Sequence, residues 1–320
     1  MTEIRQDAAL RALIVATILA PLVLIGGCAE GNSLGTSKQA EGIVYDGYLS
    51  GAKVCVDQVV NRQCDDPPEP ATFTDLQGNF SLLDLTPEQA RFPIVAEVVA
   101  GTIDLDTGLP APAGLKYLAP AGSTAISAFS TIIQIRIEQQ IAAGLDAVPI
   151  AVPSLATLKA TVTAGLATEL GLPAGMDLTR YDPIAAANNT SLNAADRLLA
   201  VKLHIVSRIL SAQIAQFLPL AEANADPGKE SAAYAALLAN LDVAQALVDL
   251  ETYITANSLT LNDLLDPGFD PSLVPVADPA VPTNADINLQ FATDANVLQA
   301  ITDMVNSEPP VSGGGGGTPP

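Results

Sequence analysis

The amino-acid sequence predicts an α+β protein with two folded domains, a small β-sandwich over residues 42–118 and an α-helical, bundle-like domain over residues 119–306. Short apolar runs alternate with Gly- and Asp-containing turns up to about residue 118, which is typical of strands. From about residue 119, apolar residues recur every three or four positions, which is the helical period. The 320 residues suffice for two domains, and the 49% of hydrophobic residues suffice for real cores.

The chain begins with an apolar run, residues 12–25, behind a slightly polar head. The run is shorter than the roughly 20 apolar residues of a bilayer span, and small residues follow it, as in a signal peptide. Ile25-Gly26-Gly27-Cys28 resembles a bacterial lipobox. The resemblance implies that residues 1–27 are a lipoprotein signal peptide and that Cys28 becomes the lipidated first residue of the mature chain. A simple N-terminal membrane anchor with an incidental cysteine is the alternative.

The residue after Cys28 is Ala29 and not Asp. For a Gram-negative source, the resemblance then implies lipid anchoring in the outer membrane. Residues 28–41 are small and polar without periodicity, and they predict a flexible tether. Residues 307–320, with their Gly and Pro run, predict a disordered tail.

Between the tether and residue 118, five short segments have the composition of strands. They are residues 42–49, 52–57, 72–74, 79–83 and 93–99. The run DGYLSGAKVCVD, with NRQCDD and EPATFTDLQGNFSL after it, resembles a module of bacterial surface lipoproteins that is similar to the transthyretin-like, carboxypeptidase-regulatory-like sandwich. The segment DLTRYDPIAA at residues 177–186 resembles a second recurrent phrase of the same lipoproteins. This family implies a display, spacing or binding module and no catalysis.

The chain has three cysteines. If Cys28 carries lipid, Cys55 and Cys64 remain, and in an exported protein a disulfide between them is the economical interpretation. Oxygen-bearing side chains crowd the loop around Cys64, and Ca²⁺ requires six to eight oxygen ligands. A calcium site therefore competes with a second interpretation, a solvated acidic loop held by the disulfide. The candidate ligands are Asp57, Asn61, Asp65 and Glu69.

The second half of the chain predicts helices with identifiable starts. Ser123, Ser154 and Asn193 are the expected N-caps of the first three, and Gly171 with Pro173 is the expected end of the second. The third helix is apolar nearly all round, so we expect it at the centre of a bundle. Further helices are expected at about residues 230–256 and 292–306.

A formal charge of −21 argues against nucleic acid as a partner. The sequence contains no P-loop, no G-x-S-x-G and no C-x-x-C, and its single histidine, His204, lies on a polar stripe expected at a surface or helix interface. The sequence therefore predicts a non-catalytic, lipid-anchored surface protein that binds a surface protein or a glycan. The alternative is an enzyme, or an enzyme accessory, that acts on a cell-surface polymer. A deep acidic cleft in the helical part would favour the alternative, and a flat apolar groove would favour binding.

Overall fold

The computed structural model describes residues 38–307 except residues 66, 68, 148 and 267. Cys28, the predicted signal peptide and nearly all of the predicted Gly/Pro tail lie outside the described residues, as does the tether up to residue 37. The described chain mixes α and β structure, which confirms the predicted class at that level. The strands are β1 (Lys38–Val44), β2 (Leu49–Ser50), β3 (Lys53–Val56), β4 (Ala71–Phe73), β5 (Asn79–Leu85), β6 (Ile94–Glu97), β7 (Ile103–Asp104), β8 (Leu109–Pro110), β9 (Lys116–Ala119) and β10 (Ala125–Ile126). The helices are η1 (Gln89–Arg91), α1 (Ala128–Leu145), α2 (Leu155–Glu169), α3 (Pro183–Asn188), α4 (Ala194–Ala223), α5 (Glu230–Ala239), α6 (Val243–Ala256), α7 (Leu261–Leu264), η2 (Pro271–Leu273) and α8 (Asn284–Ser307).

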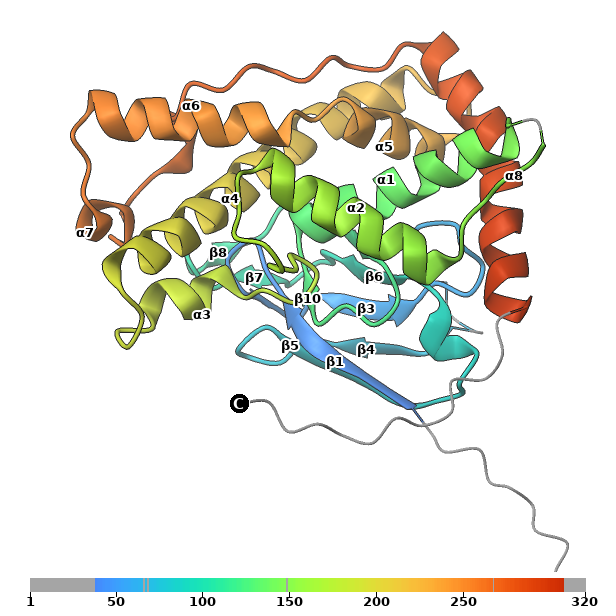
Figure 1. Cartoon of the computed structure of the whole chain (residues 1–320), viewed down its shortest axis with the longest axis horizontal. Helices are drawn as coiled ribbons and strands as arrows, with labels where there is room; N and C mark the ends of the chain where they lie inside the picture. Colours follow the sequence, from blue (N-terminus) through green and yellow to red (C-terminus); the bar gives the residue numbers. More distant parts are fainter. Residues whose placement is uncertain (1–37, 66, 68, 148, 267, 308–320) are drawn as a thin grey trace, which may run out of the picture. The chain divides into compact units, whose positions relative to one another are not determined.

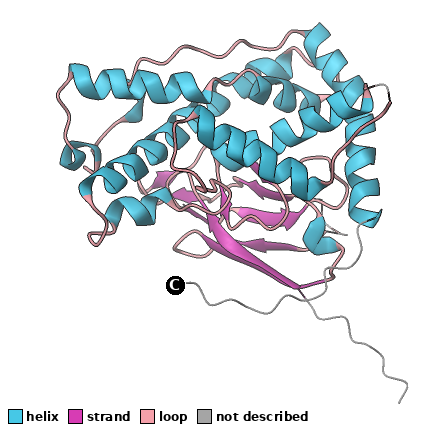
Figure 2. Cartoon of the chain, in the orientation of Figure 1, coloured by secondary structure: helices cyan, strands magenta, loops and turns pink. Residues whose placement is uncertain are grey.

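The described strands form three small sheets, in the orders β10-β1-β5, β2-β7-β8 and β4-β3-β6-β9. All their pairings are antiparallel except that of β1 with β10. Figure 2 shows the strands gathered on one side and the helices stacked over them. The first strand begins at Lys38, within the segment expected to be tether, because residues 38–43 pair with β5.

N-cap side chains fix the first residues of several helices. Ser154 accepts from the Thr157 N–H and Asn193 from the Asp196 N–H, so both predicted caps are confirmed. The prediction for Ser123 was wrong, because Ala125 and Ile126 pair with β1 as a strand and α1 starts after Ser127.

Two further helix predictions needed correction in their bounds. The segment 230–256 is broken into α5 and α6, because the Asp242 carboxylate accepts from the Gln245 N–H and starts a new helix. The last helix, α8, starts at Asn284 and not near residue 292. Gly171 ends α2 as predicted, at a φ of +61° that favours glycine.

A large hydrophobic core runs through the sheets and the helices. It includes Val54 and Tyr117 from strands, Ile133 from α1, and Leu210 from α4, all 1% exposed or less. The described residues belong to one compact unit. The segments 42–118 and 119–306, predicted as separate domains, therefore share their core.

The long helix α4 is central, as its apolar circumference predicted. It contacts α3, α5, α6, α7 and α1. Among the described helices it is long and apolar enough to cross a membrane, and the bent pair α5 and α6 (53°) would also pass that test as one span. Of the most apolar window of α4, 56% is buried inside the fold, so the same composition also fits a core helix.

Candidate functional site

The predicted disulfide is present, which confirms the pairing of Cys55 with Cys64. Cys55 lies in β3, and Cys64 lies in the loop that follows, with their Cα atoms 5.6 Å apart. β3 pairs with both β4 and β6. The bond therefore fastens the acidic loop to the interior of the four-stranded sheet.

The four predicted calcium ligands lie in this loop, but their oxygen atoms are occupied by the chain itself. The Asp57 carboxylate accepts from the N–H groups of Asn61 and Arg62 at 3.0 and 2.7 Å. The Glu69 carboxylate accepts from three N–H groups, those of residues 58, 59 and 65. The Asn61 side chain donates to Asp65 at 2.7 Å. Among the described residues no group of three or more His, Cys, Asp and Glu side chains could hold a metal ion, so the geometry does not support calcium here.

The same hydrogen bonds explain the conformation of the loop. Val60 and Arg62 have φ values of 54° and 63°, which non-glycine residues rarely adopt. Asp57 accepts from the N–H of Arg62 and so helps hold the loop in this shape. Burial raises the pKa of Asp57 to about 7, although its two backbone N–H partners act in the opposite direction.

Arg62 is the residue of this loop that sequence reasoning missed. Its guanidinium is 2% exposed and donates to Glu138 of α1 and to Asp294 of α8, with closest N–O distances of 2.7 and 2.8 Å. It also donates to the Ser231 hydroxyl at 3.1 Å. The loop is thereby joined to three helices. Nothing local in the sequence indicates this, because the carboxylate partners lie 76 and 232 positions away.

His204 lies at an interface between α4 and strand connections, which matches one of the two places expected for it. Its Nε2 is 2.9 Å from the Asp46 carbonyl oxygen and 2.9 Å from a carboxylate oxygen of Asp106. Arg208, one helical turn further, lies 3.9 Å from the same carboxylate. These side chains border a cavity of about 270 Å³. Burial, followed by the charge of Asp104, raises the pKa of the Asp46 carboxyl to about 8.

The two segments that carried the lipoprotein resemblance contact each other. Tyr48 of the DGYL run donates its hydroxyl to the carboxylate of Asp182, in the DPI run, at 2.7 Å. Asp182 also caps α3 through the N–H of Ala185. Gly47 is needed for close packing, because a Cβ there would lie 2.1 Å from a carboxylate oxygen of Asp104. The motif residues therefore join the strands to the helices.

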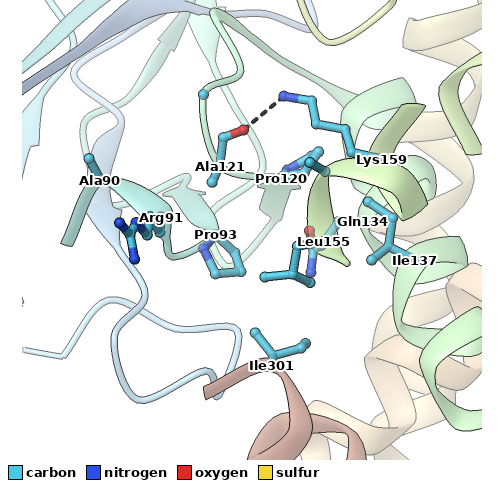
Figure 3. A pocket seen from close by; sticks show the side chains of 12 residues that line it. Ala90, Arg91, Pro93, Pro120, Ala121, Gln134, Ile137, Leu155, Lys159 and Ile301 are labelled. Carbon is cyan, nitrogen blue, oxygen red and sulfur yellow. Dashed lines mark hydrogen bonds between the residues drawn. The ribbon is translucent and has the colours of Figure 1, made fainter. Parts of the chain in front are cut away.

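A cavity with mostly apolar walls lies elsewhere. A hollow of about 250 Å³ separates the segment around η1 and the β9–β10 turn from helices α1, α2 and α8. Figure 3 shows Pro93, Leu155 and Ile301 around it, with Lys159 on the Ala121 side and Ile301 on the opposite side. Its walls are mostly apolar, and the polar side chains among its lining residues are Arg91, Gln134 and Lys159.

A second, more open hollow of about 690 Å³ continues along α2. The two hollows share Ala156 and Lys159, so Lys159 lies at their junction. The second hollow adds Arg180 and Asp177 to the charged lining. We call the two together the α2 cavity.

The Lys159 amine has neutral partners inside the protein. Nζ donates to the Ala121 carbonyl oxygen at 2.8 Å and lies 3.5 Å from the Ser123 hydroxyl. Burial lowers the pKa of this amine to about 8. A sequence signal for this position exists, since Lys159 is the single basic residue in the Ala- and Thr-rich sequence of α2.

Comparison with known proteins gives no assignment: no family model, no curated protein and no solved structure matches this chain. The resemblance to surface lipoproteins therefore remains an expectation from the sequence motifs, and any functional argument depends on the residues themselves.

Proposed function

We propose that this chain is a non-catalytic binding protein, exported and held at the outer membrane by lipid on Cys28, and that the α2 cavity holds an apolar ligand. The observation that carries the proposal is the hollow of about 250 Å³ with mostly apolar walls and a few polar side chains. Ligand sites typically combine these two properties. This role is compatible with the other functions predicted from the sequence. They are a sandwich module that displays or spaces another part of the protein, and a helical part that binds a surface protein or a glycan.

A volume comparison limits the size of the ligand. An engineered cavity of about 150 Å³ in another protein binds benzene. Sites for drug-sized molecules occupy about 300–1,000 Å³. The smaller hollow, at about 250 Å³, falls between these limits, so the apolar part of the ligand that it holds should be a single alkyl chain or a small ring. The more open hollow of about 690 Å³ adjoins it.

The test measures binding of 1-decanol, an uncharged alkyl probe, by isothermal titration calorimetry. The protein is the fragment of residues 35–320, which contains the compact unit. Ala156 is exposed and borders both hollows, so Ala156→Trp should fill the entrance and abolish binding. Thr161→Trp is the matched control, because Thr161 is exposed on the same helix and borders neither hollow. Equal binding by the Ala156→Trp protein, or the absence of binding by any ten-carbon alkyl probe, would show that the cavity is not the ligand site.

The lipid anchor has a separate test. Metabolic labelling with palmitate and intact mass should show an acylated mature chain that starts at Cys28, and Cys28→Ser should abolish both. A Cys28→Ser protein that keeps its acyl mass and its partition into detergent would contradict the anchor.

A second candidate function is the enzyme acting on a surface polymer. The specific observation in its favour is the cluster at the cavity of about 270 Å³, where His204 meets Asp106 and where the nearby Asp46 has a raised pKa. A histidine paired with a carboxylate, with an acid of raised pKa nearby, is typical of acid–base catalysis. Turnover of cell-wall glycan fragments that is lost in Asp106→Asn would favour this candidate over binding.

A further inference from the structure

From the charges around the α2 cavity we infer that its ligand is a monoalkyl carboxylate, with the alkyl chain in the apolar hollow and the carboxylate at Lys159. The inference depends on the proposed function, because it names the ligand class of the same site. The expected ligand is a single alkyl chain that ends in an anion, and binding assays can separate it from neutral and cationic alkyl chains.

The charged residues that line the α2 cavity are mostly basic. The chain has 35 Asp and Glu residues and 14 Lys and Arg residues, so an arbitrary patch of its surface should carry a net negative charge. Among the described residues the α2 cavity reverses this balance, since Arg91, Lys159 and Arg180 border it and the acidic side chain beside them is Asp177, 3.8 Å from the Arg180 Nε. A local basic patch in an acidic protein attracts an anion selectively.

The Lys159 amine is placed to meet an anion. It lies where the apolar hollow meets the open one, and its hydrogen-bond partners are a carbonyl and a hydroxyl. The charge of Asp177 in the same hollow offsets the burial of the amine only in part. An amine whose hydrogen-bond partners are neutral gains from a carboxylate, because a charge-assisted hydrogen bond is roughly twice as strong as a neutral one. Its lowered pKa reflects the same incomplete compensation.

The two hollows differ in how open they are and in their charged lining. Apolar side chains, such as Ile137, Leu155 and Ile301, line the smaller hollow behind the amine. The larger hollow is open and carries Arg180 and Asp177. An alkyl chain therefore fits on one side of Lys159, and a charged end that remains partly hydrated fits on the other.

The experiment compares three ten-carbon probes by calorimetry on the fragment of residues 35–320 at pH 7, namely decanoate, 1-decanol and decyltrimethylammonium. We expect decanoate to bind at least about tenfold more tightly than decanol, as one charge-assisted hydrogen bond can provide. Lys159→Met should reduce the affinity for decanoate to that for decanol. Lys202→Met is the control, because it removes a charge from the ion pair between Lys202 of α4 and Glu251 of α6, and neither residue borders the cavity.

The outcomes separate the two claims. If decanol binds as tightly as decanoate, or if the cationic probe binds best, the carboxylate inference is wrong while the apolar cavity stands as the ligand site. If none of the three probes binds, both claims fail. Should Lys159→Met not fold, Lys159→Gln keeps an N–H donor on the side chain without carrying charge, and it should lose the preference for decanoate in the same way.

Discussion

The substitution Arg62→Met tests whether the disulfide loop is anchored by charge. The guanidinium of Arg62 is 2% exposed, and its partners Glu138 and Asp294 are 4% and 5% exposed. Methionine fills a similar volume, so the main effect is that two buried carboxylates lose their cation. Removal of one partner from a buried ion pair costs about 3–5 kcal/mol.

Two features of the structure place the expected loss within that range. Glu138 keeps a hydrogen bond from Gln134 at 2.9 Å, and Asp294 keeps one from Gln290 at 2.7 Å. These amides reduce the penalty but do not supply a positive charge. With domain stabilities of about 5–15 kcal/mol, a loss of this size removes a large part of the folding free energy.

The assay is urea unfolding of the fragment of residues 35–320, followed by circular dichroism at 222 nm. For an m-value of about 3 kcal/mol/M, the midpoint should fall by roughly 1 M or more. Arg136→Met is the matched control, because the Arg136–Glu169 pair is 30% and 35% exposed and should contribute less than about 1 kcal/mol. A midpoint for Arg62→Met that falls no further than that of the control would refute the reasoning.

A rescue variant separates charge from packing. If the loss comes from unpaired carboxylates, Glu138→Gln and Asp294→Asn in the Arg62→Met background should restore a large part of the stability. A triple variant that is as unstable as Arg62→Met alone would assign the loss to side-chain packing.

Three further predictions concern the loop and the buried acids. Replacing Cys55 and Cys64 by alanine should lower the free energy of unfolding by about 2–3 kcal/mol, and an unchanged urea midpoint would contradict a stabilising role of the disulfide. Millimolar calcium should leave the melting temperature as it is in EDTA, because Asp57 and its neighbours already accept backbone N–H groups; a rise of several degrees would restore the calcium prediction. As the pH rises, stability should fall by up to about 1.4 kcal/mol per pH unit for each acid, from about pH 4 to pH 8 for Asp46 and from about pH 4 to pH 7 for Asp57, because their raised folded-state pKa values make the folded chain bind more protons than the unfolded chain. Asp46→Asn should flatten that slope in urea titrations at several pH values, and equal slopes in the two proteins would exclude Asp46 as the cause.

Local signals in the sequence predicted the elements whose structure is decided locally. The caps Ser154 and Asn193 and the end at Gly171 depend on side chains within a few residues, and the structure has them as predicted. The start of α1 did not follow from local signals. Residues 125–126 have the apolar pattern of the helix beside them, but a strand far away in sequence, β1, pairs with them instead.

The same distinction explains what could be predicted of the candidate sites. The Cys55–Cys64 bond is local and was predicted from the count of cysteines. The crowding of Asp57, Asn61 and Glu69 was also visible, but the sequence could not show that backbone N–H groups occupy their oxygen atoms. The α2 cavity is bordered by η1, a turn, and three helices, so no stretch of sequence contains it.

The contact between Tyr48 and Asp182 changes what the family resemblance can support. The two motifs lie 134 positions apart, yet one hydrogen bond of 2.7 Å joins them. A charge-assisted hydrogen bond of this kind contributes about 1.5–3 kcal/mol to the stability of the fold. This contribution requires both motifs, which is a physical reason for them to occur in the same chain. The resemblance is then evidence about how strands and helices are joined, and it carries no information about the ligand. The residues that bear on the ligand lie outside both motifs, around Lys159, which is why the binding tests address that position.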